Sequence, residues 1–180
     1  LKIEPKPTNF WQSFVTIQTG CDNYCTYCVV PYARGREKNR PVKEILDEIN
    51  VLVKKGCKEV TLLGQVVNNY KASDVNSFSK KNPFTKDHFA GLLWEINQIK
   101  GTERIHFTAP DPQYFTEEQI QALTLPKQLN FLHLPVQSGD DEILKKMNRK
   151  YTAKNYVDLV KRIRKVKPEI TLGTDLIIGF

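Results

Sequence analysis

The 180-residue sequence lacks any long hydrophobic run, and this absence excludes a membrane-spanning helix. Such a helix needs about 18 or more consecutive apolar residues. The sequence also lacks internal repeats and low-complexity tracts, so a solenoid architecture is excluded. With 40% hydrophobic and 26% charged residues, the composition is that of an ordinary globular domain.

Histidine and cysteine are scarce. The three histidines, His88, His106 and His133, all lie far along the chain from the first cysteines. Of the four cysteines, three fall at positions 21, 25 and 28, a spacing that suits a metal or cluster better than several mutual disulfides. Free cysteines of this kind belong in a reducing compartment, so we predict a cytoplasmic protein.

Acidic residues are outnumbered, and the formal net charge is +7 with a pI of about 9.2. This balance favours polyanionic partners such as nucleic acid. Two basic groups are expected to surround the strand ends, where they would suit the phosphates of an RNA stem-loop. They are Arg34, Arg36, Lys38, Arg40 and Lys43, and then Lys145, Lys146, Arg149, Lys150 and Lys154. A third group, from Lys161 to Lys167, is expected to be solvated.

Apolar residues alternate between strand-like runs and helical spacing. Strands are predicted at 14–17, 60–63, 105–108, 131–134 and 170–180. Helices are predicted over 42–53, 89–96, 116–123 and 156–163 and from about residue 140, with a long loop over 68–86. This alternation predicts an α/β fold with a parallel sheet, either doubly wound or a (βα) barrel. In both, ligands bind at the carboxyl ends of the strands.

The three close cysteines follow the first predicted strand in the pattern C-x3-C-x2-C. Three thiolates can hold three corners of a cubane iron–sulfur cluster and leave the fourth iron open to a cofactor. The alternative is a zinc-stabilised nucleic-acid-binding module, which needs a fourth ligand. The remaining cysteine, Cys57, precedes the second strand and is expected to pack as a small hydrophobe.

Gly20 to Cys28 resembles the signature of the radical S-adenosylmethionine (SAM) superfamily. Residues 29–35, Val-Val-Pro-Tyr-Ala-Arg-Gly, are similar to those of its methylthiotransferases. Residues 62–68, Leu-Leu-Gly-Gln-Val-Val-Asn, and 133–139, His-Leu-Pro-Val-Gln-Ser-Gly, resemble the MiaB-type branch, the tRNA-2-methylthio-N6-dimethylallyladenosine (isopentenyladenosine) synthases. The resemblance runs from about residue 14 to the end.

The resemblance implies a partial (βα) TIM-like barrel of the radical SAM type, truncated to about five parallel strands. It implies that residues 1–13 link to an N-terminal domain with a second [4Fe–4S] cluster. Residues 14–180 would then be the radical SAM core, followed by an RNA-binding domain. Leu1 in place of Met, and a final Ile-Gly-Phe that looks like a strand cut short, fit a piece of a longer protein. We expect this piece alone not to complete the full reaction.

The implied mechanism places a [4Fe–4S] cluster on Cys21, Cys25 and Cys28, with SAM on its open iron. An electron, supplied by a donor such as a flavodoxin-type protein, then breaks the sulfonium bond. The resulting 5′-deoxyadenosyl radical abstracts hydrogen from C2 of N6-isopentenyladenosine at tRNA position 37, in the anticodon stem-loop, and a methylthio group is installed there. Related enzymes that act on threonylcarbamoyladenosine or on a ribosomal protein remain alternatives.

Supporting contacts to the cofactor are predicted at the strand ends. Tyr27 is expected to pack near the adenine, and Gly64 and Gln65 to meet the methionine amino group. Gln137 ends the fourth strand, and Arg149 is a candidate partner for the carboxylate because its guanidinium is forked. The run Thr108-Ala109-Pro110-Asp111-Pro112 departs from the family pattern, usually a Ser-His-Pro-like run, so the contacts of the third strand end stay open.

Overall fold

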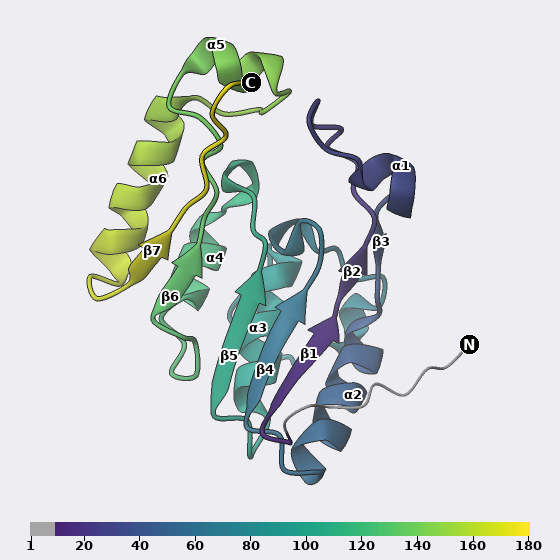
Figure 1. The fold of residues 1–180 in the computed structure, drawn as a ribbon. Helices are drawn as coiled ribbons and strands as arrows, with labels where there is room; N and C mark the ends of the chain where they lie inside the picture. Colours follow the sequence, from purple (N-terminus) through teal and green to yellow (C-terminus); the bar gives the residue numbers. More distant parts are fainter. Residues whose placement is uncertain (1–9) are drawn as a thin grey trace.

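Parallel strands that alternate with helices organise residues 10–180, the part of the chain that the computed structural model describes (Figure 1). Strands β1 (Gln12–Thr16), β4 (Glu59–Leu63) and β5 (Arg104–Thr108) pair in that order, all parallel. Strands β6 (Phe131–His133) and β7 (Thr171–Gly173) form a second parallel pair. The predicted α/β fold with about five parallel strands is confirmed.

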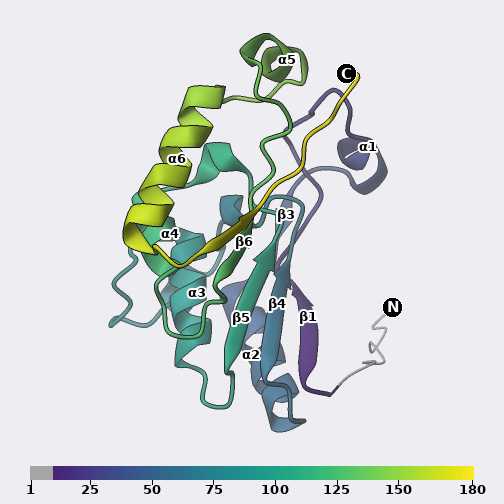
Figure 2. The same cartoon turned by 60° about the vertical axis from the view of Figure 1, so that its left-hand side comes forward.

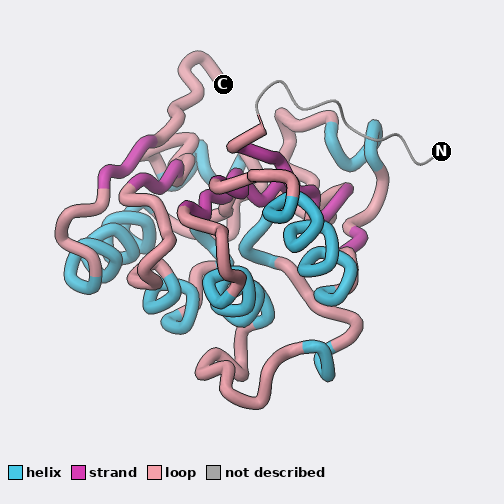
Figure 3. Tube along the Cα trace, turned by 90° about the horizontal axis from the view of Figure 1, so that it is seen from below, coloured by secondary structure: helices cyan, strands magenta, loops and turns pink. Residues whose placement is uncertain are grey.

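The two groups of strands join beside β5. The backbone N–H of Ile105 donates to the carbonyl of Lys127 at 2.7 Å, and the N–H of Leu129 donates back to Ile105 at 3.0 Å. The segment just before β6 therefore continues the sheet. Seen along the strands, the sheet curves with its helices along one side, and within residues 10–180 no pairing closes β7 onto β1 (Figure 3). The result is an open, partial barrel.

Within residues 10–180, six helices and a short ribbon complete the fold; Figure 2 shows their arrangement from a second side. The helices are α1 (Val30–Arg34), α2 (Val42–Lys54), α3 (His88–Gln98), α4 (Glu117–Ala122), α5 (Asp141–Lys146) and α6 (Ala153–Val166). The antiparallel ribbon pairs β2 (Gln18–Thr19) with β3 (Lys38–Asn39). Single 3-10 turns lie at Val67–Asn69, Val75–Ser77 and Pro112–Tyr114.

The core lies between the sheet and the helices. Val15, Leu62 and Phe107 stand side by side on β1, β4 and β5, and all are buried against the helical layer. Phe107 meets Phe89 of α3 edge to face, with ring centroids 5.1 Å apart. On the opposite face of β1, Phe14 is 62% exposed. The sheet thus buries one face and leaves at least part of the other open, as alternating side chains dictate.

Side-chain caps explain where the later helices begin. Asp87, Thr116 and Asp140 accept hydrogen bonds from the backbone N–H groups of residues 90, 119 and 143, at the starts of α3, α4 and α5. Each satisfies one of the donors that a helix start leaves free. At α4 only half of a capping box forms: Thr116 accepts from the Gln119 N–H, but the Gln119 side chain donates to the Asn68 carbonyl and to Asp87.

Several expectations need correction. The strand predicted at 170–180 is only Thr171–Gly173, and the β2–β3 ribbon and α1 were not predicted. Strand β1 begins at Gln12, inside the predicted 1–13 linker, while residues 1–9 of that linker lie outside the described residues. Within residues 10–180, no helix is both long and apolar enough to cross a bilayer.

Lys167, expected to be solvated, is buried at the end of α6. The residue is only 6% exposed to solvent. Its Nζ donates hydrogen bonds to the carbonyls of Leu123 at 2.9 Å, Gln128 at 3.3 Å and Leu129 at 3.4 Å. Burial lowers the pKa of Lys167 below its ordinary value. The ammonium ties α6 to the segment that follows α4.

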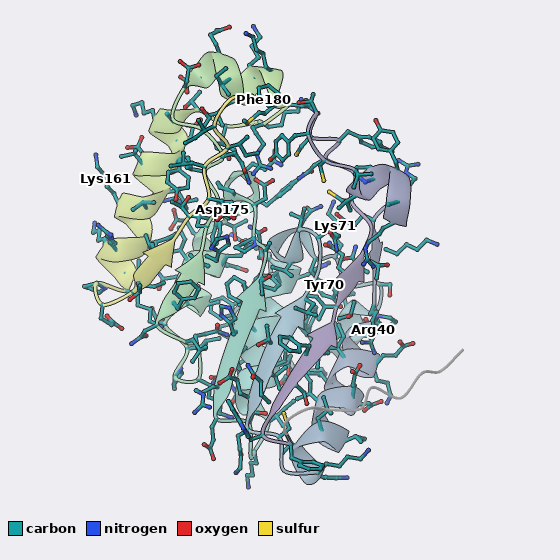
Figure 4. All side chains as sticks on the ribbon, viewed as in Figure 1. Arg40, Tyr70, Lys71, Lys161, Asp175 and Phe180 are labelled. Atoms are coloured by element: carbon teal, nitrogen blue, oxygen red, sulfur yellow. The ribbon has the colours of Figure 1, made fainter. Side chains whose placement is uncertain are left out.

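Replacing Lys167 should therefore destabilise the fold. Lys167→Met keeps the apolar stem but leaves the carbonyls without their donor, so we expect the free energy of unfolding in urea to fall by about 2–3 kcal/mol. The matched control is Lys161→Met on the exposed side of α6, which projects away from the molecule (Figure 4) and should change stability by less than ~0.5 kcal/mol. Equal effects at the two positions would contradict the assigned role of Lys167.

Candidate active site

The loop that carries the three cysteines runs from β2 to α1 and starts from a backbone shape that only glycine tolerates. Gly20 has φ +72°, and a Cβ at this position would lie 2.1 Å from the carbonyl oxygen of Arg36. The close approach lets the Cys21 N–H donate to the Gly35 carbonyl at 3.1 Å. The β2–β3 ribbon, together with Gly35 shortly before β3, therefore fixes the position of Cys21.

The far side of the loop is held by the turn that follows α5. Asn148, with φ 59°, donates from Nδ2 to the carbonyls of Asn23 and Tyr24, each at 3.0 Å. Thr26 adds two bonds: its N–H reaches the Met147 carbonyl at 3.2 Å, and its hydroxyl reaches the Lys146 carbonyl at 2.9 Å. These contacts bring the end of β1 and the elements after β6 around one space.

That space is a cavity of about 190 Å³ at the carboxyl ends of the strands, where the sequence predicts ligands. The sulfur atoms near it, drawn in yellow, lie between α1 and the C-terminal segment (Figure 4). Its lining contains all three close cysteines, each with a free thiol, and four of the five other predicted cofactor contacts. The lining residues of interest are Cys21, Cys25, Cys28, Tyr27, Gln65, Gln137 and Arg149, together with Asn23 and Asp111.

The chemistry of the lining fits an iron–sulfur cluster. The Asn23 N–H lies 3.4 Å from the Cys21 sulfur, and Nη1 of Arg149 lies 3.4 Å from the Cys25 sulfur, so two of the thiols already face donors. Hydrogen bonds to the sulfurs are one way a protein tunes such a cluster. Burial raises the pKa of the Cys21 thiol above its ordinary value.

A single-ion site is not favoured. Across residues 10–180, no three His, Cys, Asp or Glu side chains stand close enough to be ligands of one metal ion. A cluster imposes a looser condition, because each thiolate binds a different iron and the sulfurs need only face the same space. Cys57 takes no part: it is 1% exposed, and its thiol donates to the Glu59 carbonyl at the other end of the strands.

Arg149 is the most tightly held side chain in the cavity. Its Nη1 lies 3.0 Å from Asp111 Oδ2, and both side chains are nearly inaccessible, at 8% and 5%. Its Nε donates to the Tyr151 hydroxyl at 3.2 Å. Burial by itself would lower the pKa of Arg149, but the attraction of Asp111, joined by Tyr151 and the hydrogen bond to Cys25, outweighs it and leaves that pKa above its ordinary value. The guanidinium is therefore charged, and Nη2 has no protein partner among the described residues.

The contacts at the end of the third predicted strand, which the sequence left open, are made by Asp111. It follows β5, and its carboxylate accepts from Asn23 Nδ2 at 3.1 Å and from the Gln113 N–H at 3.1 Å. Asn68 holds its backbone on both sides, accepting from the Asp111 N–H at 2.8 Å and donating to its carbonyl at 3.0 Å. Burial raises the pKa of Asp111, and Arg149 partly offsets the effect. The departure from the family pattern at residues 108–112 was the one signal in the sequence that marked this position.

Of the other predicted cofactor contacts, Tyr27 and Gln137 line the cavity and Gly64 does not. Tyr27 packs edge to face against Phe180, with ring centroids 6.4 Å apart, and burial raises the pKa of its hydroxyl. Gln137, with φ 66°, donates its N–H to the Asp175 carbonyl at 2.9 Å beside the cavity. Gly64 is not among the lining residues; a Cβ there would press on Gln18 and Val67 instead.

The basic residues form a less uniform ring than predicted. Arg40 is tied to Glu48 at 2.7 Å and to the Thr16 carbonyl, and its own carbonyl accepts from the Tyr70 hydroxyl at 2.6 Å (Figure 4). Arg149 is inside the cavity. Three more have acidic partners within 4 Å, so the predicted ring is in part a set of ion pairs: Arg36 with Asp22, Lys43 with Asp47, and Lys154 with Asp158.

Comparison with protein families decides what kind of cavity this is. Residues 15–180 match the Radical SAM superfamily. The chain belongs to the radical SAM superfamily. The family predicted from Gly20 to Cys28 is confirmed, and members of this superfamily bind a [4Fe–4S] cluster and SAM. The three thiols therefore line the cavity of a radical SAM fold, which is the arrangement that such a cluster needs.

Within the superfamily, the chain is similar in sequence to curated proteins that share one name. The chain is 46% identical over its full length to tRNA-2-methylthio-N(6)-dimethylallyladenosine synthase of Roseobacter denitrificans, of which it covers 40%. It is 48% identical over 94% of its length to the proteins of that name from Buchnera aphidicola and Clostridium perfringens, covering 38% and 36% of them. The chain thus spans about two fifths of the length of the curated relatives that it matches.

Solved structures share the fold at lower identity. The radical SAM methyltransferase TsrM from Kitasatospora setae, seen with cobalamin and a [4Fe–4S] cluster, matches 94% of this chain and 31% of its own, with a TM-score of 0.70 and 19% identity. Methylornithine synthase PylB matches 94% of this chain and 45% of its own, with a TM-score of 0.57 and 18% identity. These likenesses support the partial barrel and nothing finer.

Gly20 offers a test of how the radical SAM loop is built. In Gly20→Ala the Cβ would strain a positive φ and meet the Arg36 carbonyl, so we expect a loss of at least about 2 kcal/mol in stability and a marked fall in iron bound per chain after anaerobic reconstitution. Gly139→Ala is the control, because a Cβ there meets nothing within 4 Å. Normal iron binding in Gly20→Ala would show that the loop does not depend on this approach.

Proposed function

We propose that this chain is the central part of a tRNA methylthiotransferase that adds a methylthio group to C2 of N6-isopentenyladenosine at tRNA position 37. The observation that carries the proposal is that Cys21, Cys25 and Cys28 line one strand-end cavity of a radical SAM fold. The 46% identity over the full chain to a tRNA-2-methylthio-N(6)-dimethylallyladenosine synthase supports this choice of substrate. The protein acts in the cytoplasm on the anticodon stem-loop, with a flavodoxin-type electron donor.

The residues of the chain divide the work by position. Cys21, Cys25 and Cys28 would hold the [4Fe–4S] cluster, which together with SAM supplies the radical chemistry. Gln65, at the end of β4, would meet the methionine amino group. Nη2 of Arg149 is the guanidinium nitrogen left for the carboxylate, because Nε and Nη1 are engaged.

Two further positions shape the space around the cofactor. Tyr27 closes one wall of the cavity next to Phe180 and would pack on the adenine. Gln137 also lines the cavity, held by the backbone of Asp175. Enclosure by these walls keeps water away from the reacting atoms, which strengthens the electrostatic contacts inside.

Iron binding tests the role of the cysteines. The 180-residue chain, reconstituted anaerobically with iron and sulfide, should turn brown with about four irons per chain. Cys25→Ala should lose most of this iron and the visible absorption. The matched control is Cys57→Ala, since Cys57 is buried at the other end of the strands and should leave iron binding unchanged. Loss of iron in both variants, or in neither, would contradict the proposed ligand set.

Nucleoside analysis of tRNA tests the substrate. Cells that lack the gene for the full-length protein should accumulate N6-isopentenyladenosine and lose its 2-methylthio derivative, and the wild-type gene should restore it while Cys25→Ala does not. The control is methylthiolated threonylcarbamoyladenosine, which should stay unchanged. Loss of that nucleoside instead, or an unchanged level of the isopentenyl derivative, would rule out the assigned base.

A further inference from the structure

Arg149 pairs with Asp111 and also contacts a cysteine sulfur, a contact that binding the carboxylate of a cofactor would not require. Nη1 of Arg149 is shared: it lies 3.0 Å from Asp111 Oδ2 and 3.4 Å from the Cys25 sulfur. We infer that the opposite charges of Arg149, which contacts the Cys25 sulfur, and of Asp111, which holds Arg149 in place, together set how easily a cluster held there accepts an electron. The inference rests on the proposed function, because it requires a cluster on the cysteines.

The guanidinium has little freedom to leave the sulfur. Besides Asp111 and Cys25, it contacts Tyr151 twice: Nε donates to the hydroxyl at 3.2 Å, and the Arg149 Cζ lies 5.1 Å from the ring centroid. Tyr151 is fixed in turn, since its hydroxyl donates to the Val136 carbonyl at 2.9 Å. A planar, always charged group held on three sides keeps one N–H near the sulfur.

Asp111 is held as firmly as its partner. Asn68 bonds its backbone N–H and carbonyl, and the Gln113 N–H bonds its carboxylate. A fourth contact comes from Asn23, which lies in the cysteine loop itself, between the first two cysteines. The carboxylate therefore connects the loop to Arg149 and fixes the distance between the guanidinium and Cys25.

The two charges should act on the cluster with opposite signs. Reduction adds one negative charge to the cluster, so the Arg149 charge and its N–H bond to sulfur favour the reduced form. The nearby carboxylate disfavours it. Both side chains are almost excluded from solvent, at 8% and 5% exposure, so water and salt screen these effects weakly.

Redox titration of the reconstituted 180-residue chain, followed by electron paramagnetic resonance of the reduced cluster, tests the signs. Asp111→Asn keeps the shape and an oxygen acceptor but removes the negative charge, and should raise the midpoint potential. Arg149→Gln should lower it. Each shift should change the reduced-to-oxidised ratio at the wild-type midpoint by about tenfold. The double variant should return close to the wild type, because both charges are gone.

The control is an ion pair at the opposite ends of the strands. Arg104 lies 2.6 Å from Glu59, so Arg104→Gln also breaks a pair but should leave the potential unchanged. Circular dichroism checks that each variant is folded. A variant that fails to fold is replaced by Asp111→Ser or Arg149→Lys, with the same expected signs and, for lysine, a smaller shift.

The outcomes separate the two proposals. A wild-type chain that takes up no cluster would overturn the proposed function. A wild-type chain that takes up a cluster, while Asp111→Asn and Arg149→Gln shift its potential in the same direction or not at all, would overturn only the role assigned here to Asp111 and Arg149.

Discussion

The contact between the cysteine loop and the turn after α5 is the constraint on which the site depends. Asn148 lies 125 residues from Asn23 in sequence, yet it donates to the carbonyls of Asn23 and Tyr24. The sheet itself is open, so pairing of strands does not bring its two ends together within residues 10–180. Three backbone groups of the loop and the Thr26 hydroxyl are hydrogen-bonded by this distant turn. Closing so long a loop is entropically unfavourable, and the packed helical layer between the two segments offsets that penalty.

Much of the fold could be predicted because local chemistry and tertiary packing agree. The apolar periods of β1, β4, β5 and α2 match the faces that are buried, and Thr116 and Asp140 cap the helices that their positions indicate. The β2–β3 ribbon has only two residues in each strand, too few to show a period. The expected long final strand fails for a different reason: Ile178 is apolar but 94% exposed, with no neighbouring strand beside it among the described residues.

The site divides in the same way. The cysteines are a local pattern, so their chemistry and their place after β1 could be inferred from spacing. The partnership of Asp111 with Arg149 could not, because Asp111 follows β5 and Arg149 follows α5, and only the tertiary fold brings their side chains to 3.0 Å. Charge counting was misleading for the same reason. Lys167 looks like a solvated helix residue in sequence, but three carbonyls from the segment after α4 converge on it.

The position of the buried pair is itself an argument for a role beyond stability. Taking two charges out of water is unfavourable, and apolar side chains of similar volume would commonly stabilise a fold equally or better. The ion pair between Arg104 and Glu59, at the opposite ends of the strands, follows that expectation, since Arg104 stays 44% exposed. Asp111 and Arg149 do not: both are almost inaccessible, and both border the cavity that holds the three thiols. Charge buried at that place, and fixed by Asn68, Gln113 and Tyr151, has a physical purpose where a charge-bearing cofactor binds next to it.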